Sequence, residues 1–230
     1  MNSTAPKAWK GKGMDGWIAR WYARTRHNDM EHFRSEASCV AARLPGGCMV
    51  LEVAPGPGFF AVELARLGDF KITGLDISRT FVEIATKHAR NAGLSIDFRF
   101  GNASAMPFAD ESFDFVYCSA AFKNFSEPVK ALDEMHRVLH RGGEALIVDL
   151  CKDTPLHEID AYVKQSGRGP VDAWLTNWTF RHMLLKRAYT RQEFVQMAER
   201  SRFGACRITA APLSTEVRLT KSANGSVAAA

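Results

Sequence analysis

The strongest constraint on the fold is a turn that joins a short apolar run to a helical pattern. The run Cys48–Val53 is typical of a buried strand, and the turn Ala54–Gly58 (Ala-Pro-Gly-Pro-Gly) follows it directly. Residues 59–67 then have a helical pattern, which Gly68 ends. The two glycines of the turn leave room beside the backbone, and the helix offers free N–H groups. This stretch therefore predicts a ligand site where a strand passes into a helix.

The same alternation of strand and helix continues along the chain. The later strand patterns are at residues 70–75, 96–100, 113–119 and 145–148, and the helical patterns between them are at 78–91 and 127–139. In this reading Gly142 and Gly143 separate the last helix from its strand. Strand-like runs at 206–209 and 215–220 predict a hairpin that closes the sheet edge. We therefore expect an α/β fold of the Rossmann-like type, with a mostly parallel sheet, helices on both faces and an antiparallel last strand.

The length of 230 residues and a hydrophobic content of 46% suit one domain with a sizeable core. We expect residues 13–221 to form that domain, between a flexible N-terminus at 1–12 and a disordered tail at 222–230. Its expected parts are an N-terminal helical cover at 13–47, a ligand-binding core at 48–150 and a helical insertion at 155–200.

The five cysteines are odd in number and scattered, and no Cys-x-x-Cys pair occurs. This usage predicts reduced thiols in a cytoplasmic protein, and it predicts no metal site. No apolar run is long enough for a transmembrane helix, and the first residues do not have a signal-peptide pattern.

An acid at the end of the second strand narrows the class of ligand. Asp76 lies 20 residues after Gly56, where a carboxylate can accept both hydroxyls of a ribose. Glu52, four residues before Gly56, would repel a pyrophosphate but would attract a cationic group. The pair favours a ligand with an adenosine and a positively charged end, and it disfavours an NAD-dependent dehydrogenase.

Five segments in this order resemble the class I S-adenosylmethionine-dependent methyltransferases. They are Val50–Gly58, Gly74–Ile77, Gly101–Phe108, Ser112–Val116 and Arg137–Gly143, and together they cover about residues 48–150. Within that family the chain looks most like the small-molecule branch that includes the ubiquinone/menaquinone C-methyltransferases. The resemblance implies a seven-stranded sheet, and transfer of a methyl group from S-adenosyl-L-methionine to a small, hydrophobic or aromatic acceptor.

The resemblance also implies roles for residues of the cofactor site. The methionine end of the cofactor would contact Glu52, Ala54, Gly56, Gly58 and Ser119. Asp76 would hold the ribose, Ile77 would pack on the adenine, and Ala103 would offer its backbone N–H. Asn102 stands where the family usually has Asp, and its amide oxygen can still accept from the adenine amino group, although Asn102 is also a common turn residue.

The acceptor is expected beyond the carboxyl ends of the strands. The resemblance implies that the N-terminal segment, acting as a lid, and the helical insertion cover it. The candidate acceptor-binding residues are Trp21, Tyr22, Phe122, Trp178 and His182. Ordinary helix packing is the alternative explanation for these aromatic stripes.

No catalytic dyad is evident in the sequence. His32 and His182 are candidate bases, because histidine titrates near neutral pH, and Lys123 with Asn124 is a further candidate pair. Transfer from a sulfonium needs a base only when the acceptor must lose a proton, so placement of the reactants is expected to dominate catalysis.

Two other functions remain open. One is a methyltransferase acting on RNA or another macromolecule; stable nucleic-acid binding is not expected, because no appended module or basic-aromatic face is evident. The other is a non-catalytic protein that binds S-adenosylmethionine and partners an active enzyme.

The net charge of +5 is unevenly spread. Residues 1–26 carry six basic residues and one acid, residues 163–191 carry the same numbers, and residues 27–162 are acidic overall. Both basic segments fall on the expected acceptor side. They suggest an acidic or lipid-like acceptor and peripheral contact with an anionic membrane, with solvated helix faces as the alternative.

Overall fold

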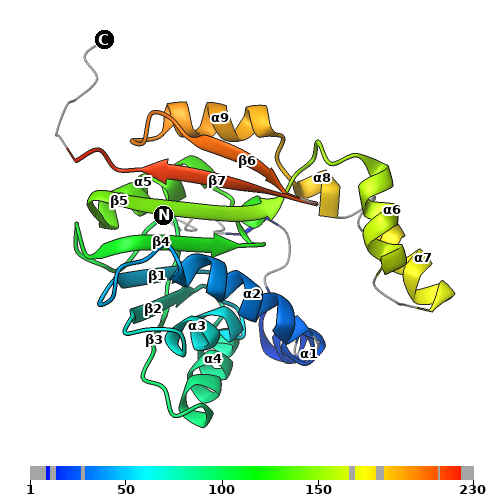
Figure 1. Cartoon of the computed structure of the whole chain (residues 1–230), viewed down its shortest axis with the longest axis horizontal. Coiled ribbons are helices and arrows are strands. Elements are labelled where there is room, and N and C mark those ends of the chain that lie inside the picture. The colour runs from blue at the N-terminus through cyan, green and yellow to red at the C-terminus, as the bar shows by residue number, and fades with distance from the viewer. Residues whose placement is uncertain are drawn as a thin grey trace, which may run out of the picture.

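A twisted sheet forms the centre of the molecule (Figure 1). The computed structural model describes residues 9–10, 14–26, 29–165, 169–179, 184–211 and 213–223. Within these residues the sheet has seven strands in the order β3-β2-β1-β4-β5-β7-β6. Their bounds are β1 Met49–Val53, β2 Lys71–Asp76, β3 Asp97–Phe100, β4 Phe113–Ser119, β5 Leu139–Leu150, β6 Arg207–Ala211 and β7 Ser214–Thr220. The predicted Rossmann-like fold class is confirmed.

The strand directions also follow the prediction. β3, β2, β1, β4 and β5 run parallel to one another, whereas β7 runs antiparallel to both β5 and β6. The switch of strand order beside β1 brings the ends of β1, β2 and β4 together at one edge of the sheet, where open α/β sheets bind their ligands.

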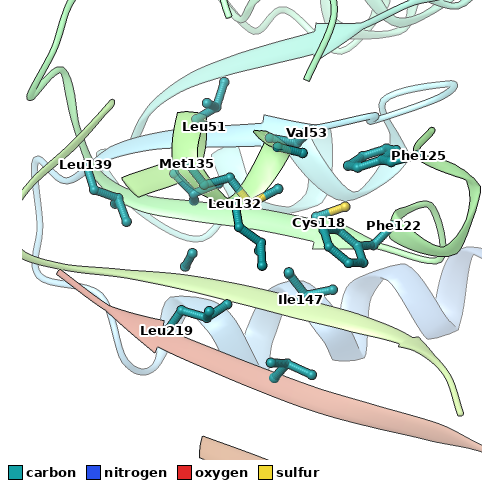
Figure 2. Close-up of a cluster of buried hydrophobic side chains, with 14 of the residues drawn as sticks. Leu51, Val53, Cys118, Phe122, Phe125, Leu132, Met135, Leu139, Ile147 and Leu219 are labelled. Atoms are coloured by element: carbon teal, nitrogen blue, oxygen red, sulfur yellow. The ribbon is translucent and has the colours of Figure 1, made fainter. Parts of the chain in front are cut away.

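Helices cover both faces, as the alternating pattern predicts. One face carries α2 (Met30–Ala41), α3 (Phe59–Ala65) and α4 (Arg79–Asn91), and the other carries α5 (Pro128–Val138) and α9 (Arg191–Arg200). Figure 2 shows the core under α5, where Leu132 and Met135 pack over Leu51, Val53 and Ile147 of the sheet. The two faces take alternate residues of each strand, because side chains along a strand point to opposite sides.

The structure corrects the predicted break at Gly142 and Gly143. Strand β5 begins at Leu139, directly after α5, and runs through both glycines. Gly142 has a φ of +81°, and a Cβ on Gly143 would lie 2.8 Å from the carbonyl oxygen of Asp114. The glycines therefore allow an irregular strand that stays close to β4, rather than a loop.

The remaining helices lie around the carboxyl edge of the parallel strands. They are α1 (Gly16–Arg26), the short 3-10 turn η2 (Phe122–Asn124), α6 (Leu156–Gln165), α7 (Pro170–Thr179) and α8 (Leu185–Arg187). In Figure 1, α6 and α7 project to the right, beyond the end of β5. Both helical additions to the core, one before β1 and one before the hairpin, occur where the sequence predicts them. No helix in the described ranges is long and apolar enough to span a membrane.

Candidate functional site

The described residues form three cavities at the carboxyl edge of the sheet. The first cavity has a volume of about 100 Å³ and lies between the ends of β1, β2 and β4 and the helices α1 and α2. A third cavity of about 20 Å³ adjoins it, since both are lined by Trp9, Ala54 and Ile77. The second cavity is larger, about 820 Å³, and lies between β4, β5, β6 and α6.

Of the two glycines predicted to contact the cofactor, Gly56 lines the first cavity and Gly58 does not. Gly56 and Gly58 have φ values of +55° and +78°, which favour glycine. A Cβ on Gly58 would lie 2.8 Å from that of Ala85, so Gly58 lets the turn pack on α4 and does not line a cavity. A Cβ on Gly56 would meet no protein atom, because Gly56 faces the first cavity.

Asp76 ends β2 and lies against this turn. Its carboxylate accepts from the backbone N–H of Gly56 at 3.0 Å and from that of Ser78 at 2.8 Å. Burial raises the pKa of Asp76 to about 6, and these N–H groups partly oppose the rise. Asp76 thus both braces the turn and lines the first cavity, as the spacing to Gly56 predicts.

The small third cavity gathers the residues predicted to contact adenine. Ile77, Asn102 and Ala103 line it, together with Trp9. The amide oxygen of Asn102 accepts from the backbone N–H of Ser104 at 2.9 Å, so Asn102 also shapes its own turn. Both the binding and the turn interpretations of Asn102 therefore fit its position.

Glu52 is buried in the first cavity without a full set of partners. The backbone N–H of Ala61 donates to its carboxyl group, but Oε2 has no hydrogen-bond partner among the described residues. Burial raises the pKa of Glu52 to about 8, and the nearby charges of Glu36 and Asp76 add to the rise. A buried carboxyl group with a free oxygen suits a cationic ligand, which would supply both a donor and a charge.

Ser119 ends β4 and lies where the first and second cavities meet. Its hydroxyl donates to Glu36 Oε1 at 2.9 Å, and both residues line both cavities, as does Ala120. His32, one helical turn before Glu36, lines the second cavity with its Nε2 4.0 Å from Glu36 Oε1, and 63% of its side chain is exposed. The structure thus places the candidate base His32 at the mouth of the second cavity.

The wall of the second cavity is mainly apolar, with a few polar groups. Its apolar side chains come from Ala120, Val148, Leu150, Pro155, Ala161, Tyr162, Ala210, Ala211 and Leu213. Asp149 and Glu158 add acids, and Arg191 adds a cation at the rim. A volume within the range of ~300–1,000 Å³, with an apolar lining and few polar groups, is typical of a site for a small organic molecule.

The predicted acceptor residues are not all brought together. Tyr22 lines the first cavity, and its ring meets that of Phe81 edge to face. Trp21 and Trp178 are exposed to 59% and 44% and line none of the described cavities. Phe122 has no exposed surface, which corrects its predicted role: it packs with Phe194 in the core and cannot touch an acceptor. His182 lies outside the described residues.

Lys123 is committed to an ion pair and is not available as a base. Its Nζ lies 2.7 Å from Asp149 Oδ1 and also donates to the carbonyl of Ala120. The backbone N–H of Lys123 donates to Asp149 Oδ2 at 2.8 Å. This buried pair fixes the chain after β4 against the end of β5.

The sequence interpretation does not assign Trp9, Arg26 and Glu36 to a site, although all three line the first cavity. Trp9 pairs through its backbone with Phe125, and Lys10 donates to the carbonyl of Asn124 at 2.8 Å. All three precede β1 and belong to no motif. Only the packing of the N-terminal segment against the edge of the sheet brings them to the cavity.

Comparison with known proteins finds similarity to methyltransferases over the central part of the chain. Residues 51–147 match the family model described as "Methyltransferase domain". A demethylmenaquinone methyltransferase of Chlorobaculum parvum is 39% identical over 100 residues, which is 44% of this chain and 40% of the relative. An O-methyltransferase of Aspergillus sclerotiorum is 36% identical over 119 residues, 50% of this chain and 45% of the relative. The chain thus spans less than half the length of these relatives.

The likeness in three dimensions extends further along the chain. A solved structure from Methanococcus maripaludis, assigned as an S-adenosyl-L-methionine-dependent methyltransferase, superposes with a TM-score of 0.75. The superposition covers 95% of this chain and 98% of the other, at 18% sequence identity. At that identity it establishes the fold alone, including the helices outside the matched core.

Proposed function

We propose that this chain, whose residues 51–147 match the model of a methyltransferase domain, is a class I S-adenosylmethionine-dependent methyltransferase that transfers a methyl group to a small organic acceptor. The observation that carries the proposal is the meeting of two cavities at Glu36, Ser119 and Ala120. One cavity has the residues that a cofactor with an adenosine and a cationic end requires. The other has the size and lining of an acceptor site.

The residues of the first and third cavities fit S-adenosyl-L-methionine. Glu52 has a buried oxygen that needs a donor, and Gly56 leaves open space beside the backbone. Asp76 would hold the ribose hydroxyls, and Ile77 with Asn102 and Ala103 would hold the adenine. When bound, the cofactor supplies an activated methyl group on a sulfonium.

The protein's own contribution is placement and exclusion of water. Holding two reactants in line at contact distance can supply ~7–11 kcal/mol of the barrier, without any acid or base. Ser119 and Ala120, at the end of β4, form the wall common to the two cavities and so define where the reacting atoms meet. His32, at the mouth of the second cavity, is positioned to accept a proton when the acceptor releases one.

An uncharged aromatic acceptor of the quinone or phenol type suits the second cavity best. Its wall is mainly apolar and carries three acids, Glu36, Asp149 and Glu158, against one permanent cation, Arg191. The wall therefore offers no surplus of positive charge for an acidic acceptor. The names of two relatives point the same way, since one acts on a demethylmenaquinone and the other is an O-methyltransferase.

Binding and transfer are tested separately. Isothermal titration with S-adenosyl-L-methionine should show a single site, and absence of binding at about 1 mM would refute the proposal. The protein is then incubated with a methyl-labelled cofactor and a cell extract. Label in a small hydrophobic molecule supports the proposal. Label in RNA favours a macromolecular acceptor, and binding without turnover favours a non-catalytic partner protein.

We further propose that the acceptor is reached from an anionic membrane surface. On α1 the small residues Ala19 and Ala23 are buried, while Trp17 and Trp21 are exposed to 74% and 59%. The exposed residues Arg20 and Arg24 follow these tryptophans three residues further along the helix. Exposed tryptophans beside arginines are typical of segments that lie at a membrane interface.

Vesicle sedimentation tests this contact. The protein should sediment with vesicles that contain phosphatidylglycerol and not with vesicles of phosphatidylcholine alone. Arg20→Glu/Arg24→Glu should remove the binding, whereas Lys71→Glu, at an exposed site at the start of β2, should leave it unchanged. Equal binding by all three proteins would contradict the proposal. The cytoplasmic location stays a prediction.

A further inference from the structure

Three buried polar atoms of the first cavity have no hydrogen-bond partner among the described residues. They are Oε2 of Glu36, Oε2 of Glu52 and Nε of Arg26. An unpaired buried polar group lowers stability, so native structures keep few of them. Three around one cavity indicate a ligand that brings the missing donors and acceptor.

The chemistry of these atoms is that of an amino-acid zwitterion. Two free carboxylate oxygens complement an ammonium group, which carries three N–H donors and a positive charge. A free guanidinium N–H complements a carboxylate. We propose that Glu36 and Glu52 together hold the α-ammonium group of the cofactor and that Arg26 holds its α-carboxylate. This inference rests on the proposed function and deepens it, because it assigns the recognition of the amino-acid end to α1 and α2.

One carboxylate reaches the cavity from a strand, and the other from the helix that covers the same face of the sheet. Glu52 of β1 is the register partner of Tyr117 in β4, and Ser119 lies two residues further on the same face. Helix α2 covers that face, with Ala37 and Val40 packed into its core. Glu36, next to Ala37, therefore lies over the edge of the sheet where β1 and β4 end, close to Glu52 and Ser119.

Glu36 is held in place while one of its oxygens stays free. The hydroxyl of Ser119 donates to Oε1 at 2.9 Å, and the buried hydroxyl of Tyr117 lies beside the same carboxyl group. A carboxylate has about four acceptor positions, so these neighbours leave capacity for a ligand. The side chain of Glu36 is 14% exposed, which keeps the attraction to an ammonium group poorly screened.

Arg26 is likewise fixed with one donor to spare. It ends α1, its Nη1 donates to Asp29 Oδ2 at 2.6 Å, and its guanidinium lies 5.1 Å from the centre of the Phe33 ring. These contacts orient the guanidinium plane and leave Nε unpaired at the cavity wall. Among the described residues that line the first cavity, Arg26 is the one with a permanently charged cationic side chain.

Ligands that differ only in the amino-acid end test the assignment. Isothermal titration is carried out with S-adenosylhomocysteine, with 5′-methylthioadenosine, which lacks both charged groups, and with decarboxylated S-adenosylmethionine, which lacks the carboxylate. Glu36→Gln should lower the affinity for S-adenosylhomocysteine by about 10- to 100-fold, as expected for loss of a charged hydrogen bond. The affinity for 5′-methylthioadenosine should stay unchanged.

Arg26→Met should lower the affinity for S-adenosylmethionine by a similar factor and leave the affinity for its decarboxylated analogue unchanged. The wild-type preference for the carboxylated ligand should therefore disappear in this variant, whereas Glu36→Gln should keep it. Glu31→Gln makes the same charge change at an exposed position of α2 and should alter none of these affinities.

The outcomes separate three conclusions. Unchanged affinity for S-adenosylhomocysteine in Glu36→Gln, or an equal loss for 5′-methylthioadenosine, would overturn the assignment of Glu36. An unchanged preference for the carboxylated ligand in Arg26→Met would overturn that of Arg26. If the wild-type protein binds none of these ligands, the proposed function itself is refuted. Thermal unfolding of each variant establishes that the fold is intact.

Discussion

Two groups of buried charge lie at the same edge of the sheet and are held in opposite ways. After β4, Lys123 and Asp149 satisfy each other, with the ammonium also bound by the carbonyl of Ala120. In the first cavity, Glu36 and Glu52 each keep a buried oxygen without a partner. Both groups lie next to the end of β4, so location in the fold does not explain the difference.

The difference separates a structural role from a binding role. Charge taken out of water costs several kcal/mol per ion unless its partners are supplied. The Lys123–Asp149 pair is complete and positions the chain between the cavities. The carboxyl groups of the first cavity are incomplete, which the protein tolerates where a ligand completes them.

The largest expected effect comes from breaking the complete pair. Asp149→Ala leaves the buried ammonium of Lys123 without its counter-ion and should lower the free energy of unfolding by about 3–5 kcal/mol. Urea unfolding measures the loss. Lys123→Met/Asp149→Leu removes both charges and should recover most of it, and a double variant as unstable as Asp149→Ala would show that the pair is not the cause.

Removing the charge of Glu52 from the first cavity should raise the free energy of unfolding, whereas breaking the Lys123–Asp149 pair lowers it. The pKa of Glu52 is raised to about 8, so the folded state binds a proton more tightly than the unfolded chain, whose carboxyl groups titrate near their ordinary value. The free energy of unfolding therefore falls as pH rises from the ordinary pKa through about 8.

Glu52→Gln lacks this decline and should be more stable than the ligand-free wild-type protein at pH 8.5, by about 4 kcal/mol, with little difference at pH 5. Unfolding in urea at both pH values measures it. The same variant should bind the cofactor more weakly. A Glu52→Gln protein that is less stable at pH 8.5 would show that Glu52 serves the fold.

The sequence predicts the site residues that lie close together along the chain, and it misses those that only tertiary packing brings to the cavity. Asp76 and Gly56 are predictable because a strand, a turn and a helix fix their positions within 20 residues. Glu36 and Arg26 reach the same cavity only through the packing of α1 and α2, which no short-range pattern encodes.

The aromatic residues of α1 illustrate the same limit. The helical spacing of Trp17 and Trp21 predicts that they share one face of the helix. It does not predict which face of the helix is buried. The structure buries the small residues Ala19 and Ala23 instead, and α1 packs on α4 with Tyr22 against Phe81. Small side chains allow close approach of two helices, a factor that hydrophobic pattern alone does not capture.

Cofactor affinity should depend on pH through the incomplete group. An ammonium ligand binds the ionised form of Glu52, whose pKa near 8 reflects burial first and then the charges of Glu36 and Asp76. Between pH 6.5 and 8.5, affinity for S-adenosylhomocysteine should therefore rise by about 10-fold or more, then level off. Isothermal titration across this range measures it. Glu52→Gln should flatten the profile, and a wild-type profile that is already flat would argue against ionisation of Glu52 on binding.

The smallest expected effect lies at the boundary between the two charge groups. Ala120 lines both cavities, and its carbonyl accepts a hydrogen bond from the ammonium of Lys123. The backbone of Ala120 has a φ of +55°, which is unfavourable for a residue with a Cβ. Ala120→Gly relieves ~1–2 kcal/mol of backbone strain but loses ~0.4–1 kcal/mol to the freer unfolded chain, so it should stabilise the protein by about 0.5–1 kcal/mol. Ala121→Gly, at a φ of −123°, relieves no strain and should destabilise by about as much. Urea unfolding of both variants decides whether the turn is strained. If it is, the protein holds Ala120 in this conformation against a cost in free energy, because the Lys123–Asp149 pair fixes the wall between the two cavities.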